Sequence, residues 1–338
     1  MSDPLSSRLS SAFLSRRCLL AGLATLPLAG CIELGPRRAH ATGSIGTGIA
    51  SEPVLHVATT RRLAEGGKRS PFLSAARAPV LTYAKAQLVP PDRSFMGRVG
   101  SVVTSDFRVQ TLDVQSGNAA EAFAEALRGR DTLLFVHGYN QTFESAAYDA
   151  AILSDGIRFS GNTALFSWAS KGGLLDYGYD RESGLLARDP LADALTATFN
   201  DPFGARVHLV AHSMGTLVTM EAFRAYRDRN GDKGLDRLAT LTLASPDIDM
   251  DVFKAHLNRM GNLREKITVI TATNDRALDL SRRIAGGDRA GALPASAFAG
   301  LGIKVVDATE FASGLVRHDA FVANDDVRAV IKRTVERG

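Results

Sequence analysis

The sequence contains the stretch Val207-His208-Leu209-Val210-Ala211-His212-Ser213-Met214-Gly215-Thr216-Leu217, in which β-branched and apolar residues end in a turn of small residues around one serine. An apolar pattern at helical spacing follows the turn. This order predicts a strand, a sharp turn and a helix. Such a turn lifts the hydroxyl of Ser213 clear of the backbone, and the helix N-terminus directs N–H groups toward developing negative charge.

The turn matches the Gly-x-Ser-x-Gly pattern of a nucleophile elbow with one substitution. Ala211 stands at the first glycine position, and its single methyl group still fits a crowded turn. Gly215 stands at the second position and allows the helix to approach the strand closely. Ser213 is therefore a candidate nucleophile. The alternative is an ordinary strand-to-helix junction with a buried serine.

Composition and charge indicate a folded domain and argue against a nucleic-acid-binding protein. With 338 residues, 45% of them hydrophobic, the chain can form one large domain or two small ones. The formal net charge is only +4, and no run of lysine and arginine is interleaved with aromatic residues. We therefore expect no nucleic-acid partner.

Residues 1–30 have the order of an export signal. Arg16 and Arg17, a pair typical of a twin-arginine signal, precede the apolar run 19–29, which is too short to span a bilayer. The run ends in Leu28-Ala29-Gly30-Cys31, which resembles the lipobox at which bacterial lipoproteins are cleaved and acylated on the cysteine. Charged residues separate a rival cleavage site, Ala39-His40-Ala41, from the apolar run.

Both cysteines of the chain, Cys18 and Cys31, lie in this leader, so the remaining residues can form no disulfide. We expect a mature protein that begins at an acylated Cys31, with residues 31–52 as a flexible tether and residues 53–338 as one folded domain. The lipid anchor predicts an exported protein on the periplasmic side of the bacterial cell envelope. Ile32 is not acidic, which favours the outer membrane by resemblance to enterobacterial sorting.

The rest of the chain alternates between strand and helix patterns. Strands are predicted at 54–58, 81–89, 107–114, 132–136, 163–168, 238–244, 267–273 and 303–306, and helices at 119–127, 143–159, 189–199 and 325–336. Continuous apolar strands separated by helices predict a mostly parallel sheet with helices on both faces. Asp189 is the expected N-cap of its helix, and the segment 171–188 is expected over the carboxyl edge of the sheet.

A second turn at that edge offers donors for an oxyanion. His137-Gly138-Tyr139-Asn140 directly follows the predicted strand 132–136, and ligands bind at the carboxyl ends of parallel strands. The backbone N–H groups of Tyr139 and Met214 are candidate donors of an oxyanion hole. The alternative is a turn in which His137 only hydrogen-bonds its own loop.

Chain order selects a candidate for the general base. A serine, aspartate, histidine order requires a histidine after Ser213, which leaves His256 and His318 of the seven histidines. His256 lies in the helix-like segment 251–260, where we expect a solvated or capping role. His318 lies in a loop after the last predicted strand, where a base can reach the serine, and is the candidate base.

Two strand ends offer the acid that orients this base. Asp275 ends the strand before the last one, and Asp247 and Asp249 end the strand before that. If strand order follows sequence order, Asp275 lies nearer to His318. Asp275 is therefore favoured, and Asp247 stays open.

The segment 228–236 has oxygen ligands at alternate positions, as a calcium-binding loop does. However, Lys233 replaces the required glycine, and Ala239 stands where a bidentate glutamate belongs. We interpret the segment as a polar loop between a helix and a strand, and predict no metal site.

Six motifs between residues 54 and 318 occur together: His137-Gly138-Tyr139-Asn140, Phe166-Ser167-Trp168, Asp180-Arg181-Glu182-Ser183, Ala211-His212-Ser213-Met214-Gly215, Ser245-Pro246-Asp247-Ile248-Asp249 and Asn274-Asp275-Arg276-Ala277-Leu278. In combination they resemble a bacterial family of exported α/β-hydrolases, often described only as of unknown function or as esterase- or lipase-like. The resemblance implies the α/β-hydrolase fold, a triad of Ser213, Asp275 and His318, ester hydrolysis and no cofactor. One departure is Arg317-His318-Asp319, where the family usually has Gly-His-Ser.

The sequence thus predicts a lipid-anchored serine hydrolase that cleaves carboxylic esters through an acyl-enzyme. Small-molecule and lipid esters are both open as substrates, and the sequence does not indicate an oligomeric state. Two alternatives stay open. One is an acyltransferase with the same triad, and the other is a non-catalytic envelope lipoprotein that uses the fold as a binding module.

Overall fold

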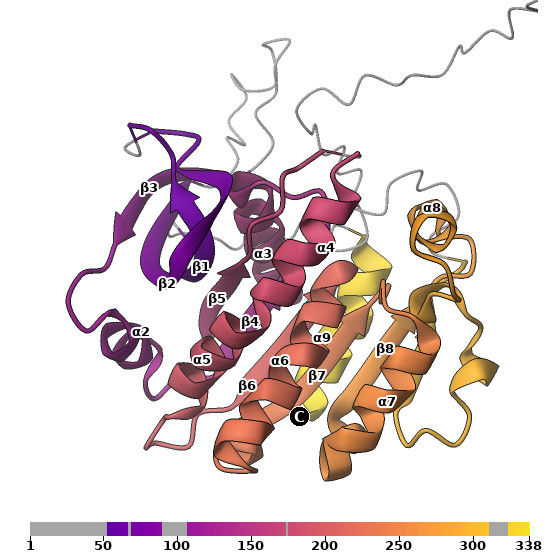
Figure 1. Cartoon of the computed structure of the whole chain (residues 1–338). Coiled ribbons are helices and arrows are strands. Elements are labelled where there is room, and N and C mark those ends of the chain that lie inside the picture. Colours follow the sequence, from indigo (N-terminus) through magenta and orange to yellow (C-terminus); the bar gives the residue numbers. More distant parts are fainter. Residues whose placement is uncertain (1–52, 67–68, 90–106, 174, 311–323) are drawn as a thin grey trace, which may run out of the picture. The chain divides into compact units, whose positions relative to one another are not determined.

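The central element is a sheet of nine strands, counted in the part of the chain that the computed structural model describes: residues 53–66, 69–89, 107–173, 175–310 and 324–338 (Figure 1). The strands are β1 (Val54–Leu63), β2 (Leu73–Val89), β3 (Arg108–Val114), β4 (Thr132–Val136), β5 (Asn162–Ser167), β6 (Val207–His212), β7 (Leu238–Ala244), β8 (Ile267–Thr271) and β9 (Lys304–Asp307). Their order in the sheet is β3-β2-β1-β5-β4-β6-β7-β8-β9. The predicted signal peptide, the tether with Cys31, and His318 lie outside the described residues.

Strand direction divides the sheet into two parts. β1 pairs antiparallel with β2, and β2 with β3. Every pairing from β1–β5 to β8–β9 is parallel. β4, β6 and β8 are buried along their whole lengths, as expected for a parallel sheet covered on both faces. The predicted mostly parallel sheet is confirmed.

Helices cover both faces of the sheet (Figure 1). One face carries α2 (Ala119–Leu127), α4 (Tyr177–Leu186), α5 (Arg188–Phe199), α6 (Met214–Asn230) and α7 (Met250–Met260), and the other carries α3 (Phe143–Ile157) and α9 (Asp325–Arg337). α8 (Arg276–Ala285) lies beyond the end of β8. Short 3₁₀ helices span Leu235–Arg237, Gly261–Lys266, Ala290–Ala292 and Ala295–Phe298. Within the described ranges, no helix combines the length and apolar character that a membrane span requires.

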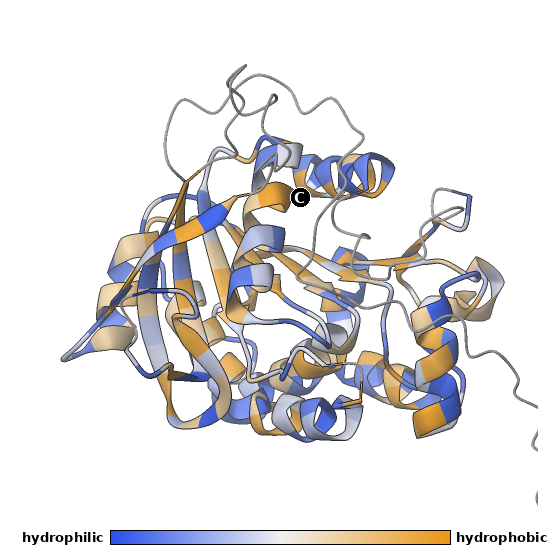
Figure 2. Cartoon of the chain, turned by 90° about the horizontal axis from the view of Figure 1, so that it is seen from above, coloured by the Kyte–Doolittle hydropathy of each residue, from blue (hydrophilic) through white to orange (hydrophobic). Residues whose placement is uncertain are grey.

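Two apolar cores lie on the two sides of the sheet. Phe123, Phe223 and Phe253 join α2, α6 and α7 to the strands, and Phe143 and Ile331 join α3 and α9 to the opposite side. Viewed from above, hydrophobic residues run along the strands (Figure 2). Each fully buried large apolar side chain in these cores contributes about 1.5–3 kcal/mol to the free energy of unfolding. These cores therefore fix the strand ends and the turns that follow them.

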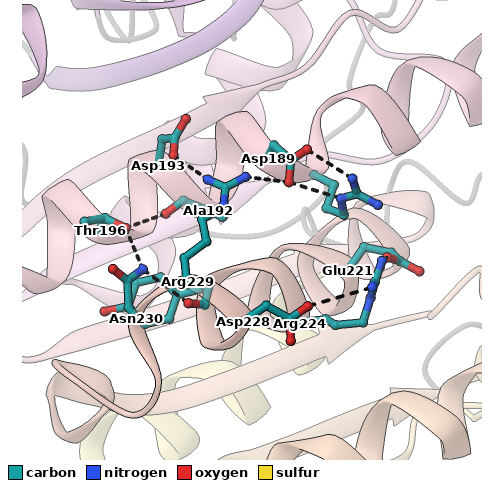
Figure 3. A network of polar contacts seen from close by, with 11 residues as sticks. Asp189, Ala192, Asp193, Thr196, Glu221, Arg224, Asp228, Arg229 and Asn230 are labelled. Atoms are coloured by element: carbon teal, nitrogen blue, oxygen red, sulfur yellow. Dashed lines mark hydrogen bonds and ion pairs between the residues drawn. The ribbon is translucent and has the colours of Figure 1, made fainter.

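The start of α5 differs from the prediction. α5 begins at Arg188 with Ala187 at its N-cap, so the prediction that Asp189 caps this helix is wrong. Asp189 lies in the first turn, where it pairs with Arg188 at 3.0 Å and with Arg229 at 2.6 Å. Figure 3 shows these pairs within a polar network between α5 and α6 that also includes Asp193. Exposed pairs of this kind each contribute little to stability.

Candidate active site

Ser213 occupies the junction between β6 and α6 in an uncommon backbone conformation. Its φ is +53° and its ψ is −127°, a region that side-chain-bearing residues adopt at a cost of about 1–3 kcal/mol. Its N–H donates to the carbonyl of Ala244 at 2.9 Å, and its carbonyl accepts from the N–H of Asp247 at 3.2 Å and the N–H of Thr216 at 2.9 Å. The predicted strand, turn and helix are confirmed, and these bonds hold the turn in its strained form.

The turn after β4 packs directly against Ser213. A Cβ atom at Gly138 would lie 2.9 Å from the Cβ of Ser213. A Cβ atom at Gly215 would lie 2.3 Å from the carbonyl oxygen of His137 and 2.7 Å from that of Val136. Both glycines are therefore required by a close approach of backbones, which brings the turn His137–Asn140 to the serine.

The two predicted oxyanion donors lie on these two segments. Tyr139 follows Gly138 in the turn after β4, and Met214 is the first residue of α6. The first N–H groups of a helix have no acceptor within the helix, and the helix dipole favours negative charge there. Both candidate donors thus lie in segments directly adjacent to Ser213.

His137 is a structural part of its turn. It is fully buried, its ring stacks on Trp168 with centroids 5.0 Å apart, and its Nδ1 lies 2.8 Å from the carbonyl oxygen of Gly138. The indole N–H of Trp168 donates to the carbonyl of His137 at 2.8 Å. These contacts hold the turn in place, and they include a hydrogen bond between His137 and its own loop.

Asp275 lies at the end of β8 as the N-cap of α8. Its Oδ1 accepts from the N–H groups of Ala277 and Leu278 at 3.0 and 3.2 Å. Its Oδ2 accepts from the hydroxyl of Ser245 at 3.1 Å. Ser245 follows β7, the strand next to β6. The carboxylate is thus held on the serine's side of the carboxyl edge.

Asp247 is more deeply buried, at 4% exposure, and its carboxylate is already engaged. Its Oδ2 accepts from the hydroxyl of Tyr177 at 3.2 Å, and its Oδ1 accepts from the hydroxyl of Ser281 and lies 3.5 Å from Nε of Arg289. Burial and the Asp247 carboxylate raise the pKa of Tyr177 to about 12, so this phenol stays a donor. Asp247 therefore ties α4 and α8 to the loop that holds Ser213.

His256 differs from the expected solvated or capping residue. It lies in α7 at 7% exposure, and its Nε2 is 3.1 Å from a carboxylate oxygen of Glu221 in α6. Burial lowers the pKa of the His256 imidazole. The residue joins two helices away from the turn at Ser213, while the predicted base His318 lies outside the described residues.

A buried pair of charges near the turn was missed by sequence reasoning. Arg61 in β1 and Asp180 in α4 are at most 2% exposed, and both contact main-chain groups of the loops that follow β4 and β5. The motif Asp180-Arg181-Glu182-Ser183 was the only signal of this pair. Among the described residues, no group of three or more histidine, cysteine or acidic side chains is arranged to hold a metal ion.

A parallel sheet flanked by helices, with a serine in a strained turn between strand and helix, defines the α/β-hydrolase class. A family model matches residues 116–334, and the family is described as "Alpha/beta hydrolase of unknown function (DUF900)". The chain belongs to this family. No curated protein matches the sequence.

Solved structures give remote likenesses. An acetylxylan esterase is 12% identical, with 61% of this chain and 97% of that chain covered and a TM-score of 0.38. A cutinase from Trichoderma reesei is 11% identical, with 64% and 89% covered and a TM-score of 0.32. A CIB-like hydrolase from Thermoplasma acidophilum is 13% identical, with 75% and 92% covered and a TM-score of 0.36.

Proposed function

We propose that the protein is a serine hydrolase that cleaves carboxylic esters through an acyl-enzyme on Ser213. The observation that carries this proposal is the strained turn of Ser213 with the backbone of Gly138 packed against its Cβ. Strain persists only where the surroundings impose it, and it clusters at active sites. Membership of an α/β-hydrolase family agrees with this reading.

The proposed reaction uses three side chains and two backbone donors. Oγ of Ser213 attacks the ester carbonyl carbon while His318 accepts the hydroxyl proton. The N–H groups of Tyr139 and Met214 stabilise the oxyanion. Collapse breaks the ester C–O bond, and His318 returns the proton to the leaving alkoxide. Water then attacks the acyl-enzyme by the same steps and regenerates Ser213.

Asp275 is the proposed acid that orients His318. Asp275 is half-buried, with its Oδ1 capping α8 and its Oδ2 accepting from the hydroxyl of Ser245. Asp247 is only 4% exposed, and its carboxylate joins Tyr177, Ser281 and Arg289 beneath the loop after β7. The deeper burial and the structural contacts of Asp247 support the ranking of Asp275 above it.

The test is covalent labelling with a fluorophosphonate, followed by identification of the modified peptide. Wild type should be labelled on Ser213, and Ser213→Ala should lose both labelling and hydrolysis of activated esters, apart from a small background. His318→Ala should reduce both severely. Ser154→Ala is a matched control. The hydroxyl of Ser154, in α3, hydrogen-bonds that of Thr163 in β5 and only joins the helix to the sheet. Folded wild type that takes no label and cleaves no activated ester of any acyl length would favour the binding module.

We also propose that Cys31 is acylated and anchors the mature protein to the cell envelope. The support is the order of Arg16-Arg17, an apolar run and Leu28-Ala29-Gly30-Cys31. Radiolabelled palmitate should enter wild type and not Cys31→Ser. An unlabelled mature protein that begins near Thr42 would contradict this proposal.

A further inference from the structure

A buried cluster of charges lies behind the turn that follows β4. Arg61, in β1, donates from Nε to the hydroxyl oxygen of Ser167 at 3.0 Å. Its two terminal nitrogens donate to the carbonyls of Ser170 at 2.7 Å and Gln141 at 2.6 Å. The guanidinium N–H groups thus donate hydrogen bonds to the end of β5, to the loop that follows it, and to the turn after β4.

Asp180, in α4, holds the same two segments from another side. Its Oδ2 accepts from the N–H of Asn140 at 3.2 Å and from the hydroxyl of Ser170 at 2.5 Å. Its Oδ1 accepts from the N–H of Lys171 at 2.8 Å. The Ser170 hydroxyl oxygen in turn accepts from the N–H of Gln141 at 3.0 Å. The N–H groups of Asn140 and Gln141 and the carbonyl of Gln141 are all held by this cluster.

Stability alone does not account for such a cluster. Asp180 is fully buried and Arg61 is 2% exposed, and taking both charges out of water is costly even when they are compensated. Burial lowers the pKa of Arg61 to about 10 and raises the pKa of Asp180. Apolar side chains of similar volume often stabilise a core as well as a buried ion pair does. What apolar side chains cannot do is fix main-chain N–H and carbonyl directions.

The main-chain groups held by the charge cluster begin one peptide unit after the candidate oxyanion donor, the N–H of Tyr139. Asn140 has a φ of +59°, a left-handed conformation that is uncommon outside glycine. Its N–H shares a planar peptide unit with the carbonyl of Tyr139, so the bond to Asp180 sets the orientation of the unit that directly follows the one carrying the N–H of Tyr139. The residue before Tyr139 is Gly138, whose backbone packs against Ser213. The turn is thus held at Ser213 on one side and at the charge cluster on the other.

We propose that Arg61 and Asp180 are positioning residues that hold the turn Gly138–Gln141 so that the N–H of Tyr139 points at the oxyanion. This inference rests on the proposed serine hydrolase activity. Neither side chain touches the reacting atoms. Their effect is on the transition state, because the oxyanion exists there and not in the bound ester.

The decisive variant is Asp180→Asn, which keeps the size of the side chain and replaces one acceptor oxygen by an NH₂ that faces N–H donors. We expect kcat for an activated ester to fall about 10- to 100-fold with KM within about twofold, because only transition-state stabilisation is lost. The rate of phosphonylation of Ser213 by a fluorophosphonate should fall by a similar factor. Ser170→Ala removes the hydroxyl that links Asp180 to Gln141 without changing a charge, and should show the same kcat effect to a smaller degree.

Matched variants separate positioning from a general loss of stability. Arg61→Met removes the guanidinium, and Arg61→Lys should restore part of kcat because an ammonium group still donates to carbonyls. Arg328→Met is the control, since Arg328 is 5% exposed and lies in α9, which packs on the face of the sheet opposite to α4. Arg328→Met should leave kcat unchanged even if it lowers the melting temperature as much as Arg61→Met does.

Two failures are distinguishable. Wild type that takes no fluorophosphonate label refutes the proposed function, and this inference with it. Wild type that is labelled, with Asp180→Asn and Ser170→Ala folded and labelled at the wild-type rate, refutes this inference alone. Should Asp180→Asn fail to fold, Ser170→Ala decides between the outcomes.

Discussion

Gly215→Ala tests the close approach between the helix after Ser213 and the end of β4. The new methyl carbon would lie 2.3 Å from the carbonyl oxygen of His137 and 2.7 Å from that of Val136. An ordinary contact needs 3.4 Å or more, so the two backbones must separate by about 1 Å. Overpacking costs about 1–3 kcal/mol, and the better helix propensity of alanine returns up to about 1 kcal/mol.

We expect Gly215→Ala to lose about 1–2 kcal/mol of unfolding free energy, which corresponds to roughly 2–8 °C in melting temperature for a domain of this size. The turn with Tyr139 moves away from Ser213 by the same distance. Because a misplacement of about 1 Å can cost roughly 100-fold in rate, ester turnover should fall far more than stability. Urea unfolding and steady-state kinetics measure the two effects.

Gly178→Ala is the matched control for this substitution. Gly178 also lies near the start of a helix, α4, but a Cβ atom there meets nothing within 4 Å. Alanine should be neutral or stabilising by up to about 1 kcal/mol at this position. If Gly215→Ala is as stable and as active as Gly178→Ala, the packing of α6 against β4 does not set the geometry of the site.

Two further substitutions test the acid and the buried histidine. Asp275→Asn should lower turnover by orders of magnitude, toward about 10⁴-fold, in a folded protein; Asp247→Asn should lower the melting temperature more than turnover, and the reverse ranking would assign the acid to Asp247. His208 is 1% exposed, and burial lowers its pKa to about 4. The unfolded state, with a histidine pKa near 6.5, therefore binds more protons as the pH falls, so unfolding free energy should be about 2 kcal/mol lower at pH 5 than at pH 8. His208→Gln should flatten that dependence in urea unfolding, and an unchanged pH slope in this variant would show that another group causes it.

The central strands and the elbow could be predicted because their signals are local. The predicted strands 132–136 and 238–244 and the predicted helix 119–127 have the bounds observed for β4, β7 and α2. The strand 132–136 is a mostly apolar run between Asp131 and His137, and the strand 238–244 alternates leucine and threonine between Arg237 and Ser245, so polar residues mark both ends of each strand. The turn at Ser213 follows from one short motif placed between a strand and a helix.

Two helices were not predicted from the sequence. α4 contains Gly178 and Gly184 within ten residues, and glycine disfavours helix interiors. α8 is amphipathic, but its apolar residues Leu280 and Ile284 stay exposed, and the helix buries only Leu278 and Ser281. In both helices, tertiary contacts rather than local propensity set the conformation, as the bonds of Tyr177 and Ser281 to Asp247 illustrate.

The contacts around the site could not be predicted either, because they join residues that lie far apart in the chain. The carboxylate of Asp180 accepts a hydrogen bond from the N–H of Asn140, which lies 40 residues earlier in the chain. No periodicity records a pairing over that distance. The sequence could place Asp247 and Asp275 at neighbouring strand ends, but not show that Asp247 contacts the buried side chains of Tyr177, Ser281 and Arg289.

The central claim is that an acyl group resides on Ser213 during turnover. The most direct measurement is to mix the full chain with activated esters of increasing acyl length, quench with acid within the first turnovers, and record the intact mass and the modified peptide. The proposed mechanism predicts a mass increase equal to the acyl group, located on Ser213 and absent from Ser213→Ala. Ester hydrolysis that persists in Ser213→Ala at the wild-type rate, with no adduct in wild type at any acyl length, would contradict it.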